Sequence, residues 1–280
     1  ILIGLVGSEM CIRDRYMAVF KEFIRDSYVV VDLETTGLSP FYDKIIEIAA
    51  VKVTDGKPAE TFSTLVDPKT RISSEITALT GISNDMVKGA PDISKAMPEF
   101  LKFAGDSALL GHNIIRFDLR FLQNYAPMEN YCIDTLNLAQ HLKADFGGFS
   151  LTALCGHYGV INDNAHRALS DCLATHEVYL RLKDEYMKNG AFFTMAANCG
   201  RKLFQQNISE KCNVGTELNV TRNEKGLLLS AGEFPVGTVS GSKQKEYEDN
   251  EDIVKKVTVS KITEGANSKL LLTAEVTVGI

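Results

Sequence analysis

The sequence predicts an α/β fold in which a mixed sheet, three antiparallel strands plus parallel strands, is flanked by helices and followed by a small β-rich domain. Three features of the 280-residue chain predict it. Residues 28–31 are β-branched or aromatic, helical and strand-like segments alternate over residues 93–188, and short strand-like runs separated by turn residues recur after residue 212. Antiparallel strands followed by alternating helices and strands are typical of a mixed sheet covered by helices.

The first three strands are expected to form an antiparallel meander. Residues 28–31 read YVVV, the composition of a strand in the middle of a sheet. Residues 44–68 (KIIEIAAVKVTDGKPAETFSTLVDP) indicate two further strands around Asp55-Gly56. This dipeptide favours two-residue hairpin turns, so the two strands should pair directly.

Helical spacing and short apolar runs follow. Ile93, Met97, Phe100, Leu101 and Ala104 recur at intervals of three and four, as on one face of a helix. Helices are expected at 73–80, 93–104, 117–125, 135–144, 150–158 and 167–188, and strands at 107–113 and 131–134. His176 and Glu177 are expected on the surface of the last helix, because no H-E-x-x-H motif follows to make them zinc ligands.

Four segments are predicted. Residues 1–16 resemble the translation of a sequencing-library adapter (VGSEMCIRDR) and are expected to be a non-native extension. Residues 17–190 form the α/β domain, 191–211 a linker or helix, and 212–280 a small β domain of barrel or sandwich type. The charged stretch 245–252 (KEYEDNED) is expected to be a solvated loop.

Composition indicates an ordinary cytoplasmic globular protein. The apolar fraction of 45% is typical of such proteins, and no run approaches the roughly 20 apolar residues of a membrane span, so no membrane partner is expected. The six cysteines lack C-x-x-C spacing, which favours reduced thiols over a disulfide framework or a zinc site. The net charge of −6 lacks the basic footprint of most nucleic-acid binders.

Two carboxylates follow the first apolar strand. Residues i and i+2 of a strand project from the same face, so Asp32 and Glu34 should lie side by side. Two like charges in a half-buried site repel and lose hydration. A divalent cation or an exposed strand end would relieve this cost, and the pair alone does not distinguish the two.

Two further acidic positions lie at the starts of helices. Asp118 follows the strand-like ALLG and occupies the start of an amphipathic helix, where a carboxylate also suits the helix dipole. In HRALSD, His166 and Asp171 would point roughly 140° apart if both were helical, but a loop position for His166 would let it approach Asp171. A plain helix-start acid and a surface loop histidine remain alternatives for each position taken alone.

Together, VVVDLETTGL, TGIS, GHNIIRFD and HRALSD resemble the motifs of the DEDDh 3′–5′ exonucleases, the DnaQ-like superfamily that includes the proofreading subunits and domains of bacterial replicative polymerases. The resemblance covers about residues 25–188 and implies a ribonuclease H-like fold. One departure is visible: four residues separate Asn113 and Asp118, where the common pattern has three. We expect a one-residue bulge before the helix.

The resemblance implies a two-metal site. Asp32, Glu34, Asp118 and Asp171 would bind two Mg²⁺ or Mn²⁺ ions, for which hard oxygen ligands are suited. His166 would act as general base, a task that its near-neutral pKa fits.

The same resemblance implies how the nucleic-acid 3′ end is bound. Thr35, Gly37 and Leu38 would line the pocket for the terminal nucleotide, with Leu38 against its base. His112, Asn113 and Phe117 are further candidates for substrate contact, and Phe117 is alternatively a core residue. Near these motifs, Arg116, Arg120 and Arg167 are either phosphate contacts or members of surface salt bridges.

The sequence therefore predicts an enzyme that releases nucleoside monophosphates from 3′ ends, with DNA the favoured substrate. An RNA-trimming exoribonuclease and a catalytically silent nucleic-acid-binding adaptor are the alternatives. The intact set of five motif residues argues against the adaptor. Residues 212–280 are expected either to position substrate, as small barrels that bind single strands do, or to bind a DNA polymerase or another protein, the alternative that their composition favours. Roles in proofreading, repair or RNA processing stay open.

Overall fold

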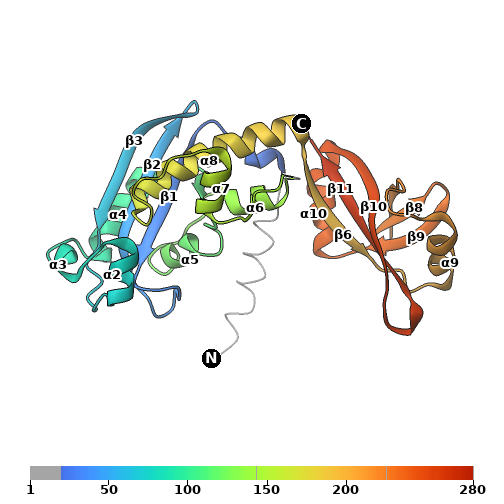
Figure 1. Ribbon diagram of the computed structural model, residues 1–280, viewed down its shortest axis with the longest axis horizontal. Coiled ribbons are helices and arrows are strands. Elements are labelled where there is room, and N and C mark those ends of the chain that lie inside the picture. Colours follow the sequence, from blue (N-terminus) through green and yellow to red (C-terminus); the bar gives the residue numbers. More distant parts are fainter. Residues whose placement is uncertain (1–19, 143, 225, 280) are drawn as a thin grey trace. The chain divides into compact units, whose positions relative to one another are not determined.

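The computed structural model describes residues 20–142, 144–224 and 226–279. Two compact units make up the chain: residues 23–140 with 144–184 form one, and residues 185–280 form most of the other (Figure 1). Residues 1–16, expected to be a non-native extension, lie outside the described residues.

The first unit is built on a five-stranded mixed sheet with the order β3-β2-β1-β4-β5. β1 pairs antiparallel with β2 and parallel with β4, while β2–β3 is antiparallel and β4–β5 parallel. The predicted combination of an antiparallel meander with parallel strands is therefore confirmed. The strands are β1 (Tyr28–Thr35), β2 (Ile45–Thr54), β3 (Lys57–Leu65), β4 (Leu109–Gly111) and β5 (Cys132–Asp134).

The predicted hairpin joins β2 to β3. Thr54 pairs with Lys57 across a two-residue loop, and Asp55 and Gly56 both have positive φ, at 50° and 73°. Positive φ at both central residues is what a type I′ turn requires, and aspartate followed by glycine tolerates it well.

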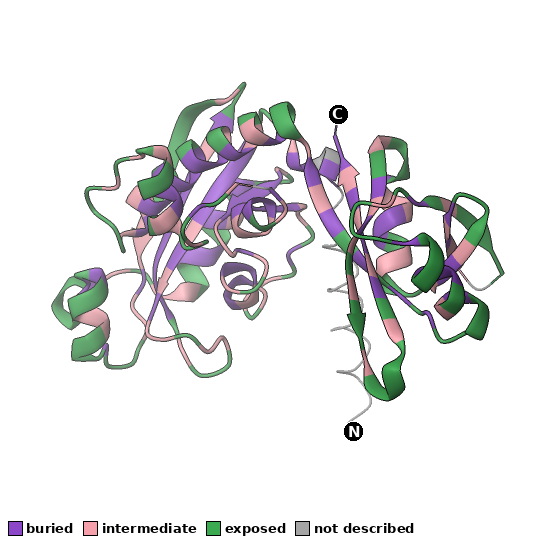
Figure 2. Cartoon of the chain, turned by 45° about the vertical axis from the view of Figure 1, so that its right-hand side comes forward, coloured by how far each residue is buried: buried purple, intermediate pink, exposed green. Residues whose placement is uncertain are grey.

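Helices cover both faces of this sheet (Figure 1). Phe62 of β3 contacts Phe100 and Phe103 of α4 on one face, whereas Cys172 of α8 donates to Ala49 of β2 on the other. β1 and β2 are almost entirely buried between these layers (Figure 2). The helices are α2 (Ser74–Thr80), α3 (Asn84–Val87), α4 (Ile93–Ala104), α5 (Asp118–Leu122), α6 (Thr135–Gln140), α7 (Leu151–Tyr158) and α8 (Ala168–Asn189).

One prediction about α8 is wrong. His176 was expected on the helix surface, but it is 2% exposed, and its Nδ1 lies 2.9 Å from the hydroxyl of Tyr28 on β1. Burial lowers the pKa of His176. The residue therefore joins α8 to the start of the central strand, whereas its neighbour Glu177 is exposed as expected.

The second unit contains two three-stranded sheets, ordered β10-β11-β6 and β7-β8-β9, rather than one barrel. It is β-rich as predicted, and α9 is fixed to β9 by a hydrogen bond from the Asn207 amide to the Pro235 carbonyl. Its elements are β6 (Ala191–Ala197), α9 (Lys202–Lys211), β7 (Asn219–Asn223), β8 (Gly226–Ala231), β9 (Phe234–Val239), α10 (Ser242–Asn250), β10 (Val254–Glu264) and β11 (Leu270–Val278).

Two expectations for this unit are wrong. Residues 191–197 form β6 instead of a linker or helix, because they pair with β11 along their whole length and bury alternate side chains. The charged stretch 245–252 is mostly helical: α10 buries Glu246, Tyr247 and Asn250 while its remaining charges face solvent. In both places long-range pairing or packing outweighs local composition.

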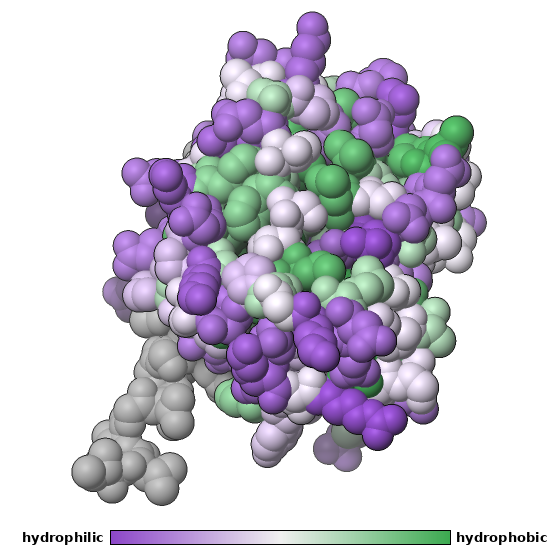
Figure 3. All heavy atoms as spheres, turned by 90° about the vertical axis from the view of Figure 1, so that its left-hand side faces the viewer, coloured by the Kyte–Doolittle hydropathy of each residue, from purple (hydrophilic) through white to green (hydrophobic). Residues whose placement is uncertain are grey.

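Surface and cysteine chemistry complete the description. Within the described part of the chain no helix is both long and apolar enough to cross a membrane. The five cysteines that the structure describes are free and buried. On the face shown in Figure 3, hydrophobic residues gather across the upper middle, with hydrophilic residues around and below them. Among the described residues, the most exposed large apolar side chains are those of Leu38, Phe41 and Tyr42.

Candidate metal and catalytic site

Three carboxylates meet where β1 approaches α8. Asp32 and Glu34 project from the same face of β1, and Asp171 lies in the first turn of α8. One oxygen of each lies within 4.8 Å of the others. Asp32 is opposite Ala49 in the sheet, whose small side chain leaves room beside it. The structure thus brings together three of the four acidic residues that the motifs single out.

Asp118 is a separate part of the site. It is the first residue of α5, only 3% exposed, and its Oδ1 accepts a hydrogen bond of 3.1 Å from the Leu33 amide. The Val29 amide of β1 donates to the Ala108 carbonyl just before β4. The pairing of β1 with β4 ends at Val30, so it does not extend to Leu33. Asp118 therefore satisfies a strand amide that β4 no longer reaches, between the two carboxylates of β1.

The extra residue before Asp118 is absorbed in a wide turn. Asn113 has a φ of 62°, and its carbonyl accepts from the amides of Arg116 and Phe117. The Leu119 amide then donates to the carbonyl of Ile114, five residues earlier. An α-helical hydrogen bond reaches back four residues, so this turn contains one residue more. The expected bulge is thus a left-handed residue followed by a π-type turn.

Asp134 was not recognised in the sequence as part of this region. The residue ends β5 and is 3% exposed. Its carboxylate accepts from the amides of Asn113 at 3.0 Å and Ile115 at 3.3 Å, so it holds the turn that leads to Asp118. The same carboxylate accepts from the amides of Leu136 and Asn137 at the start of α6. A lone aspartate at a strand end carries no sequence signal that distinguishes this role.

His166 lies in the turn before α8, not in the helix. It has a φ of 64° and an exposed side chain, and its amide donates to Asp171 Oδ2 at 3.0 Å. The other oxygen of Asp171 accepts from the amide side chain of Asn162, which Ser170 holds by a hydrogen bond of 2.7 Å. Asp171 is thereby fixed, while the imidazole of His166 remains accessible to solvent.

Glu47 is another residue that sequence reasoning missed. It lies on β2 directly opposite Glu34, and its side chain is 3% exposed. Two of the three guanidinium nitrogens of Arg167 donate to this carboxylate, Nη2 at 2.8 Å and Nε at 3.2 Å, and the Ala168 amide donates to it at 3.1 Å. Of the two alternatives for Arg167, it is thus an ion-pair member, and the pair fixes the start of α8.

The residues expected to contact substrate have varied surroundings. Thr35 is buried and donates to the Gly37 carbonyl at 2.6 Å, while Leu38 is 84% exposed. His112 is half-buried with Nδ1 3.0 Å from the Thr135 hydroxyl, and burial lowers its pKa to about 4. Phe117 is half-buried, with its ring 5.1 Å from that of Phe121.

Burial and mutual repulsion dominate the electrostatics of the acidic residues. Loss of hydration, followed by repulsion from Asp118 and Asp171, raises the pKa of Asp32 well above its usual range. Loss of hydration, with repulsion from Asp171 and Glu47, raises the pKa of Glu34 to about 8. Burial also raises the pKa of Asp118 to about 8, although hydrogen bonds from backbone amides oppose the shift. A divalent cation would favour the ionised forms of all three, and hard oxygen ligands suit Mg²⁺ or Mn²⁺.

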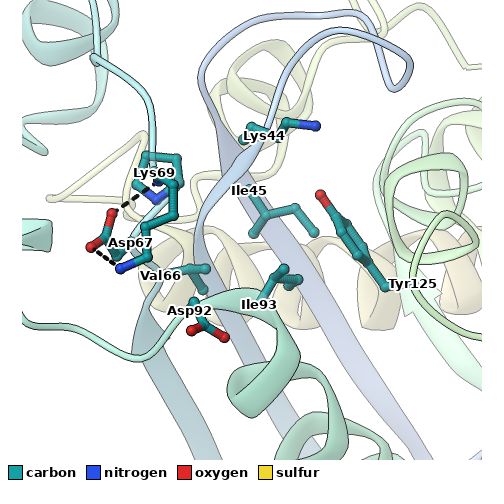
Figure 4. Close-up of a pocket in the computed structure, with 9 residues that line it drawn as sticks. Lys44, Ile45, Val66, Asp67, Lys69, Asp92, Ile93 and Tyr125 are labelled. Carbon is teal, nitrogen blue, oxygen red and sulfur yellow. Dashed lines mark hydrogen bonds and ion pairs between the residues drawn. The ribbon is translucent and has the colours of Figure 1, made fainter.

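A small pocket of about 170 Å³ lies beside the loop that leaves β1. Ile45, Val66 and Ile93 supply apolar walls, and Lys44 and Tyr125 contribute polar atoms (Figure 4). Lys69 at one side is paired with Asp67 at 2.8 Å. None of the motif residues lines this pocket, which is distinct from the carboxylate cluster.

Comparisons with known proteins agree with this geometry. The sequence profile of an exonuclease family, RNase T, matches residues 29–179. The chain is 41% identical over 174 residues to a protein of Clostridium perfringens named DNA polymerase III PolC-type, a match covering 59% of this chain and 12% of that protein. The PolC-type DNA polymerase III of Staphylococcus aureus is 34% identical over 207 residues, covering 72% of this chain and 14% of that protein. The chain thus spans a small part of these relatives' length.

Solved structures share the fold. The structure of Escherichia coli exonuclease I in complex with a dT13 oligonucleotide matches with a TM-score of 0.53 at 16% identity. The match covers 84% of this chain and 55% of that protein. At this identity the similarity establishes a shared fold.

The raised pKa values predict how stability depends on pH. Glu34 and Asp118 have pKa values of about 8 when folded without metal, against ordinary values near 4 in the unfolded chain. Between those values the folded state binds more protons, so the free energy of unfolding falls as pH rises. We expect the metal-free thermal midpoint to be lower at about pH 9 than at about pH 6, and Mg²⁺ to raise it more at the higher pH.

The Glu34→Gln variant is the control for this prediction. It removes one titrating carboxylate and should therefore reduce both the pH dependence and the response to Mg²⁺. An Mg²⁺ response of equal size at both pH values in the parent protein would contradict the electrostatic account.

Glu47→Ala should destabilise the fold. The substitution leaves the Arg167 guanidinium and the Ala168 amide without their shared acceptor. We expect the free energy of unfolding to fall by about 2–4 kcal/mol in urea denaturation, near the lower end for broken buried pairs because Arg167 reaches solvent. Asp249→Asn, which breaks the exposed Lys245–Asp249 pair, should cost less than about 1 kcal/mol. Equal losses in the two variants would contradict this role of Glu47.

Proposed function

The chain belongs to the RNase T exonuclease family, and from that premise we propose that it removes nucleoside monophosphates one at a time from the 3′ end of DNA. The observation that carries the proposal is a cluster of carboxylates, buried at Asp171 and half-buried at Asp32 and Glu34, whose oxygens lie within 4.8 Å of one another. Burial and mutual repulsion make this set costly without a cation. The site therefore suits hydrolysis assisted by divalent metal.

The carboxylates fit a pair of Mg²⁺ or Mn²⁺ ions, with Asp32, Glu34, Asp118 and Asp171 as the proposed ligands. Bound metal would supply electrostatic stabilisation of the charge that develops on the phosphodiester and would favour ionisation of water. The chain's own contribution is rigidity. Asn162 and the His166 amide hold Asp171, and Asp118 is bonded to the Leu33 amide.

His166 is proposed as the general base. Its side chain projects from an exposed turn, and its own backbone amide is bonded to Asp171, so it sits next to the acidic cluster. A ring nitrogen would accept the proton of the attacking water while the water oxygen bonds to phosphorus and the 3′ oxygen of the preceding nucleotide leaves.

DNA is the proposed substrate because the relatives described above are named as DNA polymerases. In that setting the role of the chain would be to correct or repair DNA ends. A DNA polymerase or a similar protein is the proposed partner of residues 212–280. This segment carries 8 lysine and arginine residues against 10 acidic ones, and the lack of a basic excess favours a protein partner over a nucleic acid.

Removal of the proposed base or of a ligand should abolish activity. His166→Ala should lower the rate constant for release of mononucleotides by about 100- to 10,000-fold. Asp171→Asn should remove detectable activity, and excess EDTA should do the same to the parent protein. The measurement is the shortening of a 5′-labelled oligonucleotide with Mg²⁺ or Mn²⁺, run in parallel on single-stranded DNA, mismatched duplex DNA and short RNA.

Matched controls lie in the same region. Asp163 is an exposed acid in the turn that contains His166, and His157 is an exposed histidine on α7. Asp163→Asn and His157→Gln should retain near-parental rates. Activity that survives EDTA or Asp171→Asn would contradict the metal mechanism. Faster cleavage of RNA than of DNA would identify the exoribonuclease alternative, and binding without cleavage the adaptor.

A further inference from the structure

The loop between β1 and β2 exposes three large apolar side chains. Leu38, Phe41 and Tyr42 are 84%, 83% and 86% exposed, within a segment of five residues. Single exposed apolar residues are ordinary, but adjacent ones on one short loop form a surface that water covers unfavourably. Leu38 already has an expected role beside the terminal nucleotide, whereas Phe41 and Tyr42 have none.

The loop is rigidly built. Asp43 accepts from the Ser39 amide at 2.8 Å and from the Thr36 hydroxyl at 3.3 Å. The amides of Tyr42 and Asp43 both bond to the Ser39 carbonyl, which closes a tight turn. A Cβ on Gly37 would lie only 2.6 Å from the Asp43 carboxylate, so the close approach requires glycine. The two aromatic rings are therefore carried on a fixed turn, which lowers the entropy lost when a ligand packs on them.

Both ends of the loop are tied to the sheet and to the end of α5. The Thr36 amide donates to the Lys44 carbonyl at 2.8 Å, and the Lys44 amide donates to the Thr36 hydroxyl at 2.9 Å. The Asn124 side chain donates to the Pro40 carbonyl. Thr36 follows Glu34 by two residues, so the base of the loop lies beside the acidic cluster.

Charge at the loop suits a nucleic acid. Lys44 is exposed where the loop enters β2, and its side chain lies at the edge of the small pocket (Figure 4). Lys44 follows Tyr42 by two residues, so this short segment carries both a cation, which can bind a phosphate, and aromatic rings, on which bases can stack. A site for a folded protein partner would need far more apolar area than two side chains provide.

We propose that Phe41 and Tyr42 form a stacking platform for the unpaired bases that precede the terminal nucleotide. The platform would favour single-stranded or frayed ends over paired ends, because a base must leave its duplex before a ring can cover its face. The proposal rests on the function proposed above, since it assigns the substrate's bases to this loop. Base stacking on aromatic rings tolerates any sequence, as a general exonuclease requires.

The test uses the full chain in a His166→Ala background, so that bound DNA stays intact. Single-stranded oligonucleotides carry the fluorescent base 2-aminopurine at the second, third or fourth position from the 3′ end, and binding is measured with Mg²⁺. We expect stacking to quench the fluorescence at one or two of these positions. Phe41→Ala/Tyr42→Ala should weaken binding by about 10- to 100-fold and abolish the quenching, while the dependence of affinity on salt stays the same.

Two controls separate stacking from a change in the fold. Phe41→Tyr/Tyr42→Phe retains both rings and should keep parental affinity and quenching. Val214→Ala shortens an apolar side chain that is 70% exposed in the other unit and should change neither. All variants should unfold at the same temperature as the parent, because both substituted rings are exposed.

The outcome separates this inference from the proposed function. In a cleavage assay with His166 intact, the alanine double variant should raise KM about 10-fold or more on single-stranded DNA and leave kcat within about twofold, as expected for lost uniform binding. If the parent cleaves DNA and the double variant shows unchanged KM, affinity and fluorescence, the platform is refuted and the exonuclease assignment stands. If the parent cleaves no nucleic acid, the proposed function itself fails.

Discussion

The burial of several carboxylates at one end of β1 is the constraint on which the rest of this unit depends. Such a cluster is unfavourable unless cations or hydrogen bonds compensate it. Asp171 receives two hydrogen bonds, and Asp118 accepts from the strand that carries Asp32 and Glu34. Hydrogen bonds thus fix these acids in place, although the repulsion among them persists without a cation.

The Glu47–Arg167 ion pair fixes the start of α8 against the sheet. Arg167 is the last residue before α8 begins, and Glu47 is opposite Glu34 in the sheet. The pair therefore joins β2, the neighbour of the strand that bears Asp32 and Glu34, to the start of the helix that bears Asp171. The positive charge also favours the ionised form of Glu34. One ion pair in this position contributes to both geometry and electrostatics.

Local sequence was sufficient for much of the first unit and for the positions of the acidic residues. The spacing of apolar residues at 93–104 reproduces α4, and Asp55-Gly56 specifies its own turn, because both signals act over a few residues. Glu47, Asn162 and Asp134 were not recognisable, since each acts on partners brought near only by the folded sheet. The predictions for His176 and for residues 191–197 were wrong for the same reason. His176 is buried against Tyr28, which is distant in sequence, and residues 191–197 form a strand because β11 pairs with them. Long-range contacts leave no local pattern in a single sequence.

The turn before Asp118 bears on how motif spacing is read. At the start of the turn, the Asn113 amide donates to the Asp134 carboxylate. At its end, the Asp118 carboxylate accepts from the Leu33 amide. With both ends anchored, the intervening backbone can gain a residue by widening its hydrogen-bonded ring while the acid stays in place. A count of residues between two motifs is then a poor measure of whether a site is intact. Searches that require a fixed interval at this point would reject a chain in which Asp118 still bonds the strand that carries Asp32 and Glu34.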